Sequence, residues 1–545
     1  MEYHSILYPG QQQEQAAQDC PWISFSQAAP KGPVYVMRGN KMVLAPKGEV
    51  QSQPKWPSFF LDLNLDQVME AMGVRAETEA GKAMMFPLPD ISSIRYRQEI
   101  FRDLQKSELY DTVCAFRTGM GEALRLLKHA GETNYPAQSS RYVLDAADAY
   151  IGAVDGFAKG LEGCEATSES LLALGRHLLK ITQSREYVQL RADTVHVMEL
   201  MDSVRYQVSI ISGCIEVRFP GEADDYAQSL RAALSAGGGQ DEEAAEAITA
   251  FRGTGMCLLE KKLMAVIRQR YQKPFESCGR FAAMHPDPID PGLKKFAEEV
   301  SFYIRYIDLM TSLGARGFRF TYPFVGEDER LSLAGIYDLA LAVRSSDASM
   351  VVPNDLCLRD DESGACITGA NQGGKTTFLR AMGQAAFLAS LGMPVAAQSA
   401  QVPLFQRFFT HFSREEEKGT ANGRLRQELL ALKHLLCWAG KGSLYMLNEM
   451  FSSTSARDAC GMTVRVISRA VESGAEVLCV THVPEAAAAC ERMASLVAQV
   501  DCAQGNARTY RIIRQAADGL AWARDLMYKY RLDRAVLKER IEHGN

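Results

Sequence analysis

The segment Gly369-Ala370-Asn371-Gln372-Gly373-Gly374-Lys375-Thr376 decides the expected fold. It matches in full the pattern G-x-x-x-x-G-K-[ST] of phosphate-binding loops. The residues Cys366-Ile367-Thr368 before it predict a short buried strand, and residues 377–391 after it predict a helix with apolar side chains at helical spacing. Glycines let backbone N–H groups close around phosphate oxygens, and a helix N-terminus adds partial positive charge. The stretch therefore predicts a phosphate-binding turn between a strand and a helix.

The residue types in this loop indicate their roles. Lys375 is expected to reach the β- and γ-phosphates of a nucleoside triphosphate, and the Thr376 hydroxyl is expected to ligate Mg²⁺. The competing interpretation is a glycine-rich turn that binds nothing, but a strand, the motif and a helix follow one another in the required order. We expect ATP and Mg²⁺ as cofactors, with nucleotide contacts at Gly369, Ala370, Asn371, Gln372, Gly373, Gly374, Lys375, Thr376 and Thr377.

Two further apolar strands are expected to end in polar residues. Leu444 to Leu447 is followed by Asn448 and Glu449, and Val477 to Val480 by Thr481 and His482. Ligands of open α/β sheets bind at these carboxyl ends of strands. We expect Thr376, Asn448 and Glu449 as metal ligands, and Glu449 and His482 as catalytic residues.

Both strand ends have plainer interpretations. Asn448 and Glu449 would simply terminate a strand, and His482 would be a structural histidine. The nucleotide-site interpretation also contains an anomaly, because an Asp normally stands where Asn448 does. This exchange removes one negative charge from the expected metal site, which weakens the hold on Mg²⁺.

The chain divides into three regions of different character. Residues 1–57 are irregular, with a possible short hairpin, and residues 58–316 are mostly helical. From 317 to 545 short apolar runs alternate with helical patterns, which predicts a mostly parallel sheet covered by helices. Within the helical region, residues 169–204 predict one helix of about 35 residues. Residues 206–219 predict a hairpin around Ser212-Gly213.

The composition excludes several classes of protein. The chain has 545 residues, of which 47% are hydrophobic and 23% charged, as in ordinary globular proteins. A net charge of -6 excludes a chain that is basic throughout, so any DNA contact must be local. The best candidate for a basic patch lies around Tyr271 and consists of Lys261, Lys262, Arg268, Arg270 and Lys273. The competing interpretation of these residues is a helix face exposed to solvent. Phosphate contacts by such residues are independent of sequence and sensitive to salt.

Cysteine spacing and hydropathy indicate the compartment. None of the thirteen cysteines stands at C-x-x-C spacing, which argues against a zinc ribbon or a thioredoxin-like pair and favours a reducing environment. The N-terminus has no apolar signal core, and no run of 18 apolar residues occurs. We expect a cytoplasmic protein with no membrane partner, associated with the nucleoid if it binds DNA.

The motifs together resemble those of the MutS family of DNA mismatch repair ATPases. TGANQGGKTTFLR resembles the family's phosphate loop, LNEMFSSTSARDA its metal-binding and signature region, and VTHVPE its histidine switch. VVPNDLCL resembles the segment that precedes the phosphate loop. The motifs stand in the family's order. The resemblance is specific over residues 366–482 and looser over 58–545.

The resemblance implies a multidomain fold. It consists of an irregular segment (1–57), a mainly α-helical core and lever with a clamp insertion (58–316), and an α/β ABC-type P-loop ATPase domain (317–545). Family members dimerise through the ATPase domain and bind DNA, so the resemblance implies a homodimer on duplex or branched DNA. Ser452, Ser453 and Thr454 match the signature loop that contacts the partner's γ-phosphate. These three residues would also serve as an N-cap for the following helix.

The departures from the family refine the expectation. Asn448 replaces the metal-binding Asp, FSSTSA replaces the glycine-rich GRGTST, and TANGRLRQEL keeps Glu428 but lacks a Ser-Thr pair. Residues 1–57 are too few for the mismatch-reading domain, and the F-x-E string at 296–298 is expected in the core. We expect a MutS-like ATP-dependent DNA-binding protein of the mismatch repair and recombination class, without direct mismatch reading. The alternative is a nucleotide-gated protein-interaction module that hydrolyses ATP very slowly.

Overall fold

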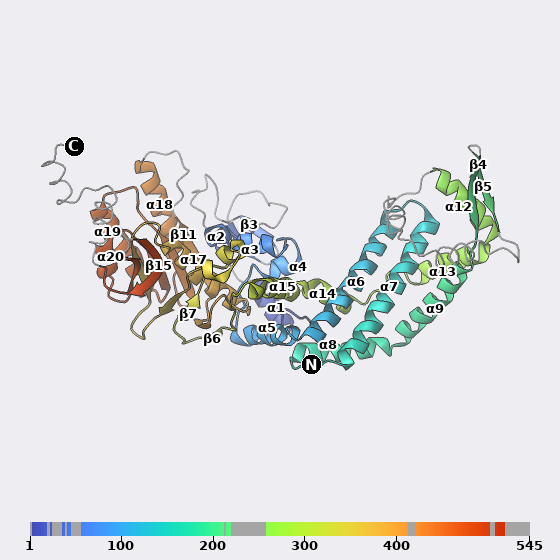
Figure 1. Ribbon diagram of the computed structural model, residues 1–545, viewed down its shortest axis with the longest axis horizontal. Helices are drawn as coiled ribbons and strands as arrows, with labels where there is room; N and C mark the ends of the chain where they lie inside the picture. The colour runs from blue at the N-terminus through green and yellow to red at the C-terminus, as the bar shows by residue number, and fades with distance from the viewer. Residues whose placement is uncertain are drawn as a thin grey trace. The chain divides into compact units, whose positions relative to one another are not determined.

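The computed structural model describes residues 3–18, 22–23, 35–38, 41–44, 56–211, 214–219, 258–412, 421–501 and 507–517. The chain forms two compact units (Figure 1). The first comprises Met1–Tyr3, Ser107–Ala166 and Leu172–Ala297, and the second comprises His4–Lys106, Thr167–Leu171 and Glu298–Asn545. Compactness thus groups residues 58–106 with the α/β part of the chain. The sequence-based division at 57/58 and 316/317 remains a prediction about domains.

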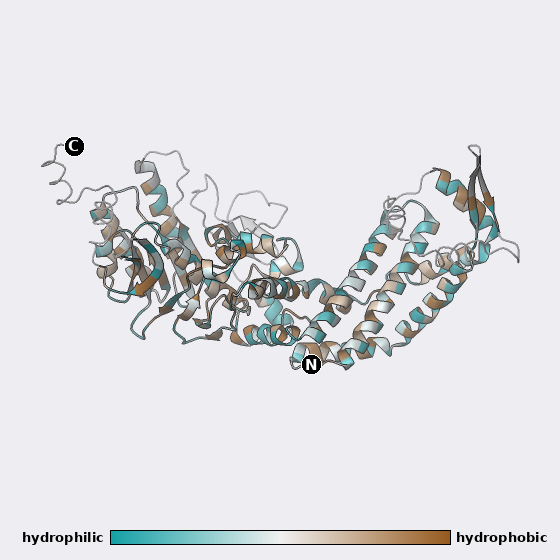
Figure 2. Ribbon diagram, in the orientation of Figure 1, coloured by the Kyte–Doolittle hydropathy of each residue, from teal (hydrophilic) through white to brown (hydrophobic). Residues whose placement is uncertain are grey.

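Long amphipathic helices build the first unit. α6 (Ser107–Glu132) and α7 (Pro136–Glu162) lie side by side, and α9 (Arg185–Asp202) and α13 (Gln272–Met284) pack against α7. Figure 2 shows hydrophilic and hydrophobic residues alternating along these helices, the pattern of helices with one buried face. Phe116, Phe157 and Phe296 stack together in the core with ring centroids 4.4 to 5.6 Å apart. Phe296 and Ala297 are buried, which confirms that the aromatic residue of the F-x-E string belongs to the core, while Glu298 is exposed.

The prediction of one continuous helix over 169–204 is wrong. The structure has α8 (Glu169–Thr182) and then α9, with a break at residues 183–184. Ser184 adopts an extended conformation, and its hydroxyl accepts the backbone N–H of Tyr187 at 3.1 Å. A serine that satisfies a free N–H in this way favours a new helix start over continuation of the old one.

Two sequence-predicted hairpins are present. β4 (Gln207–Ile211) pairs antiparallel with β5 (Cys214–Arg218), while the expected turn residues 212–213 lie outside the described residues. In the N-terminal segment, β2 (Tyr35–Arg38) pairs with β3 (Lys41–Leu44), and β1 (Trp22–Ile23) adds to β2. The remaining elements of these regions are α1 (Gln11–Gln18) and α12 (Leu258–Arg270).

A six-stranded sheet is the centre of the second unit. Its order is β11-β12-β13-β9-β14-β15, and all pairs are parallel except β14 with β15. Helices alternate with these strands, as the sequence predicts (Figure 1). The strands are β9 (Gly364–Gly369), β11 (Arg407–Phe412), β12 (Ser443–Asn448), β13 (Glu476–Val480), β14 (Ala494–Asp501) and β15 (Ala507–Arg514). The helices are α17 (Lys375–Ser390), α18 (Ala421–Leu436), α19 (Ala456–Glu472) and α20 (Pro484–Ala488).

Helices cover both faces of this sheet. On one face, Tyr445, Leu447 and Val477 pack with buried residues of α18 and α19. On the other face, α17 approaches β12 so closely that a side chain at Gly383 would overlap the Met446 sulfur. Strands buried on both faces explain why their sequences are continuous apolar runs rather than alternating ones.

A smaller four-stranded sheet and short helices complete the second unit. The sheet has the order β6-β10-β7-β8. Its strands are β6 (Phe324–Gly326), β7 (Ser332–Ile336), β8 (Asn354–Cys357) and β10 (Ser399–Pro403). The helices are α2 (Ser58–Asp62), α3 (Leu65–Ala71), α4 (Glu79–Ala83), α5 (Ile91–Leu104), α15 (Ser301–Ala315), α16 (Leu339–Arg344) and the 3-10 helix η1 (Ala348–Met350). The helix α14 (Pro291–Glu299) lies mostly in the first unit, which ends at Ala297.

A buried carboxylate organises the segment before α8. Asp103 accepts the backbone N–H groups of Thr167 and Ser168 at 2.8 and 2.7 Å, and it also pairs with Lys106 at 3.0 Å. Burial raises the pKa of this carboxyl, but the hydrogen bonds from Ser168, Lys106 and Thr167 outweigh that effect and lower the pKa to about 2. The ionised carboxylate therefore stabilises the fold.

We expect Asp103→Asn to lower the unfolding free energy by about 1.5–3 kcal/mol, because a buried charged acceptor is lost. The folded-state pKa lies below the unfolded value of about 4, so the contribution is complete above that pH and is lost as the pH falls toward 2. Urea unfolding at pH 7 and pH 5 should therefore give the same difference. The exposed Asp111→Asn is the control and should change stability by less than about 0.5 kcal/mol. A difference that shrinks between pH 7 and pH 5 contradicts this account.

Candidate functional site

The predicted phosphate loop connects β9 to α17. Gly369 and Gly374 have φ angles of 111° and 86°, and Gln372 has a φ of 61°. A side chain at Gly369 would come within 2.9 Å of the Ala498 backbone nitrogen and oxygen, so only glycine fits. These dihedral angles turn the chain sharply into the first turn of α17. The N–H groups of a first helical turn have no partner within the helix, which makes this end of α17 suited to an anion.

Lys375 is a buried ammonium at the start of α17. Its side chain donates to the carbonyl oxygens of Gly369 and Ala370, both at 2.9 Å. Burial lowers the pKa of Lys375, and the nearby Glu449 carboxylate opposes that shift. A buried cation held by neutral carbonyls has a strong electrostatic preference for an added anion such as phosphate.

Thr376 and Asn448 meet although 72 residues separate them. The Thr376 hydroxyl donates to the Asn448 side-chain oxygen at 3.0 Å. This contact arises because β12 ends beside the first turn of α17. The hydroxyl and amide oxygens, together with the Glu449 carboxylate, are the hard oxygen donors that Mg²⁺ prefers. Within the described residues, no group of three or more His, Cys, Asp or Glu side chains is placed to hold a metal ion.

Glu449 and His482 form a second pair at adjacent strand ends. The His482 Nε2 lies 2.7 Å from the Glu449 carboxylate, and the Glu449 backbone N–H donates to Val480 at 2.9 Å. The hydrogen bond from His482 lowers the pKa of Glu449 and outweighs the opposing effect of burial. Glu449 also has a φ of 54°, a strained value for a residue with a side chain. The pair gives a carboxylate of fixed position with a hydrogen-bonding partner.

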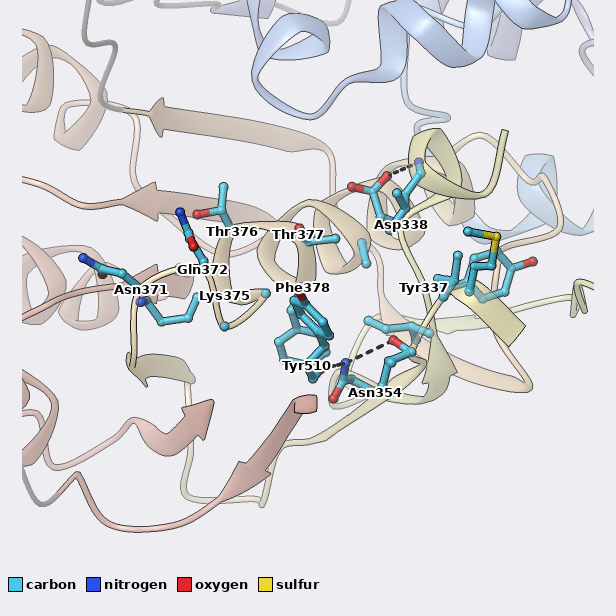
Figure 3. Close-up of a pocket in the computed structure, with 18 of the residues that line it drawn as sticks. Tyr337, Asp338, Asn354, Asn371, Gln372, Lys375, Thr376, Thr377, Phe378 and Tyr510 are labelled. Carbon is cyan, nitrogen blue, oxygen red and sulfur yellow. Dashed lines mark hydrogen bonds between the residues drawn. The ribbon is translucent and has the colours of Figure 1, made fainter. Parts of the chain in front are cut away.

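These side chains border one cavity of about 580 Å³, shown in Figure 3. This is an ordinary volume for a small-molecule site. The cavity is lined by Asn371–Thr377 of the loop together with Glu449 and His482. Gly369, Ala370 and Asn448 do not line it, and Asn448 is linked to it through its hydrogen bond with Thr376. The structure therefore brings together most of the residues that the sequence predicts for nucleotide and catalytic contacts. Their roles remain predictions.

The cavity lining also contains residues that the sequence analysis missed. It carries apolar and aromatic side chains from Tyr337, Met350, Phe378 and Tyr510. Asn354 fixes the last of these, since its amide group donates to the Tyr510 carbonyl at 3.0 Å and accepts the N–H of Ile512 at 2.6 Å. Figure 3 shows Tyr510 beside the start of α17 and Asn354 below it. In the sequence, the one feature that pointed to this part of the cavity is the segment VVPNDLCL, which contains Asn354.

The loop after Glu449 is held in place by a residue that is distant from it in the sequence. Glu428 of α18 accepts the backbone N–H of Phe451 at 2.8 Å and pairs with the buried His411 at 3.0 Å. The predicted signature residues Ser452, Ser453 and Thr454 follow, and none of them lines the cavity. The Ser453 hydroxyl is buried and has no hydrogen-bond partner among the described residues.

The N-cap interpretation of the signature residues is wrong by one position. The capping residue of α19 is Ser455, whose hydroxyl accepts the N–H of Asp458 at 3.2 Å. Ser452 to Thr454 are thus not needed to start the helix. A role in trans stays a prediction.

The structure does not gather all five basic DNA-contact candidates on one helix face. Lys261 and Arg268 stand seven residues apart on α12 and share a face, but Arg270 lies about half a turn round from Lys261. Lys262 is exposed on the same helix, and Lys273 belongs to α13. The hydroxyl of the nearby Tyr271 is already engaged within the protein, because it donates to the Arg205 carbonyl oxygen at 2.6 Å. A role of these residues in DNA contact remains a prediction.

Among the described helices, none combines the length and the apolar composition that crossing a membrane requires.

Comparison with known proteins places these residues in a family. Residues 365–524 match the model of MutS domain V. The DNA mismatch repair protein MutS of Thermotoga neapolitana is 28% identical over 186 residues, which are 34% of this chain and 23% of that protein. MutS of Thermotoga maritima is 28% identical over 194 residues, covering 35% and 24%. The MutS protein homolog him-14 of Caenorhabditis elegans is 28% identical over 142 residues, covering 26% and 17%.

The matched part of the chain thus spans about a quarter of the length of these curated relatives. It includes the phosphate loop, the ends of β12 and β13, and the loop that follows Glu449. The family match and the geometry agree on the same residues. Residues 365–524 of the chain are thus related to domain V of the MutS proteins.

Proposed function

We propose that this chain is a MutS-like ATP-dependent DNA-binding protein, a dimeric ATPase clamp of the mismatch repair and recombination class. Its ATPase domain is of the P-loop, ABC type, and it holds duplex or branched DNA without reading mismatches directly. The observation that carries the proposal is the convergence of Lys375, Thr376 and the Glu449–His482 pair around one cavity, with Asn448 hydrogen-bonded to Thr376. The family match supports the same class of activity.

In this proposal each part of the cavity has one task. The N–H groups at the start of α17 bind the phosphates, and Lys375 moves its ammonium from the loop carbonyls to a phosphate oxygen. Thr376, Asn448 and Glu449 would hold Mg²⁺, which would neutralise phosphate charge when bound. Glu449 orients and deprotonates the attacking water, with His482 fixing its carboxylate. The wall formed by Tyr337, Met350 and Tyr510 accepts the apolar faces of the base.

Because Asn448 is neutral, we expect this chain to hydrolyse ATP slowly. The metal ligand set then contains one carboxylate, Glu449, and that carboxylate also has the task of activating water. The alternative function follows from the same observation. If turnover is negligible, the chain is a nucleotide-gated protein-interaction module, in which binding alone sets the dimer state.

We expect Lys375→Ala to weaken ATP binding about 10- to 150-fold, because one charge-assisted hydrogen bond contributes roughly 1.5–3 kcal/mol. Isothermal titration calorimetry with Mg-ATP measures the dissociation constant. Lys82→Ala, a lysine of the same unit that pairs only with Glu79, is the matched control and should bind ATP as the native protein does. Unchanged affinity in Lys375→Ala would remove the cavity from the nucleotide proposal.

We expect Asn448→Asp to raise phosphate release and to lower the Mg²⁺ concentration at half-maximal rate, each about tenfold or more, because a charged ligand replaces a neutral one. An aspartate at this position still accepts the Thr376 hydroxyl, so the geometry is kept. Glu449→Gln serves as the comparison, and it should retain ATP binding while losing at least about a hundredfold in turnover. An unchanged rate in Asn448→Asp shows that this residue is not what slows hydrolysis.

DNA binding is tested by fluorescence anisotropy with matched duplex, a single mismatch and a four-way junction, with and without Mg-ATP. We expect retention that depends on ATP, ignores the mismatch and falls steeply with salt. The double charge reversal Lys261→Glu/Arg268→Glu should reduce the salt slope by about 0.9 per lost phosphate contact. Lys128→Glu, an exposed lysine on α6, is the control and should leave the slope unchanged.

The outcomes of this experiment separate the two functions. DNA binding that ignores ATP in a preparation that binds ATP contradicts the clamp. No DNA binding in any nucleotide state, with ATP still bound, favours the protein-interaction module.

A further inference from the structure

The loop after β12 contains two residues with side chains in the left-handed conformation. Glu449 has a φ of 54° and Phe451 a φ of 59°. Residues other than glycine keep this conformation only where the surrounding structure compensates for it, and such residues are concentrated at functional sites. Glu449 is the carboxylate that the proposed function assigns to water activation. The contacts that hold this loop therefore determine where that carboxylate lies.

The neighbouring strand β13 holds the loop on its amino side. The Glu449 backbone N–H donates to the Val480 carbonyl oxygen at 2.9 Å, and His482 Nε2 lies 2.7 Å from the Glu449 carboxylate. These contacts fix the backbone of Glu449 where it leaves β12 and fix the end of its side chain. The conformation between Glu449 and Phe451 needs a second support, on the carboxyl side of the loop.

Glu428 of α18 gives that support. One oxygen of its carboxylate accepts the Phe451 N–H at 2.8 Å and lies 3.0 Å from His411 Nε2. His411 stands opposite Leu447 in the β11–β12 register, so the carboxylate is fixed by the sheet as well as by its own helix. The His411 and Glu428 side chains are only 2% and 11% exposed. A hydrogen bond to a carboxylate in such a place is stronger than one between neutral groups in water.

The Phe451 side chain makes this attachment rigid. Its ring is fully buried and belongs to the core cluster between the sheet and the helices α18 and α19. Met450 is buried in the same cluster. A loop whose side chains and N–H group are both held cannot relax toward an ordinary φ without breaking a contact. Glu449 is thereby kept in the lining of the nucleotide cavity, together with His482.

We propose that Glu428 is a positioning residue for ATP hydrolysis, which acts through the Phe451 N–H to hold the Glu449 carboxylate beside His482. The inference rests on the proposed function, since it takes Glu449 as the group that activates water. Glu428 itself does not line the nucleotide cavity. Its loss should therefore lower the rate of hydrolysis and leave the affinity for the nucleotide intact.

Phosphate release and Mg-ATP binding, measured on the same full-length variants, test this inference. In Glu428→Ala we expect kcat to fall about 10- to 150-fold, because one hydrogen bond to a carboxylate is lost. The dissociation constant for Mg-ATP, measured by calorimetry at saturating Mg²⁺, should change less than about threefold. Glu428→Gln keeps an acceptor oxygen at nearly the same place and should retain several-fold more of the rate than Glu428→Ala.

A double-mutant cycle shows whether Glu428 acts through Glu449. If it does, the loss of Glu428 has no further effect once the Glu449 carboxylate is gone. Glu428→Ala/Glu449→Gln and Glu449→Gln should then have the same rate within about twofold in single-turnover assays with radiolabelled ATP. A residue that only supports the fold lowers the rate by the same factor in both backgrounds.

Leu435→Ala is the matched control for a loss of stability. This buried leucine lies two turns after Glu428 on the same helix, and its truncation keeps the Glu428 carboxylate. It should lower the unfolding temperature at least as much as Glu428→Ala does, because it leaves a cavity in the core. Its kcat should stay within about threefold of the native value.

The outcomes separate this inference from the proposed function. An unchanged kcat in Glu428→Ala, or an equal loss in the Glu449→Gln background, overturns the positioning role and leaves the proposed function standing. A native chain that hydrolyses ATP no faster than Glu449→Gln overturns the role of Glu449, and the role of Glu428 with it. Where Glu428→Ala does not fold, the same cycle with Glu428→Gln decides.

Discussion

The in-register parallel pairing of three strands determines the arrangement of the candidate site. Asn448 of β12 stands beside Val480 of β13, and Val480 stands beside Ile367 of β9. Because parallel strands in register end at one edge, the residues that follow them are brought together without any contact of their own. The loop after Ile367, the Asn448-Glu449 pair and His482 all occupy that edge. A shift of one residue in either pairing would move these side chains to the wrong face of the sheet.

Much of this arrangement could be predicted from the sequence, because its signals are local. The phosphate loop is a continuous motif, and an apolar run that ends in polar residues marks the carboxyl end of a buried strand. The pair Thr376–Asn448 could be predicted as neighbours for that reason alone. The aromatic wall could not be predicted. Tyr337 and Tyr510 come from distant parts of the sequence, and nothing in their local pattern shows that the fold places both in the lining of one cavity.

The two corrected predictions have a common physical cause. Periodicity reports which face of a helix is buried, and it does not report where backbone N–H groups find their partners. Ser184 ends one helix and starts another while the apolar spacing continues almost unchanged on either side. Ser455, rather than Ser452 to Thr454, caps α19 for the same reason. Capping depends on one side chain and one dihedral angle, and the spacing of hydrophobic residues carries little information about either.

The fully buried strand β12 also fixes a length within the molecule. It runs from Ser443 to Asn448, which is hydrogen-bonded to Thr376 at the phosphate loop, and it is paired on both sides, with β11 and with β13. At about 3.3 Å per residue, these two positions stand roughly 17 Å apart. The strand cannot slide, because sliding would break both ladders and invert every side chain. Any mechanical communication between the two ends of the sheet must therefore take the form of tilt or twist, at constant spacing.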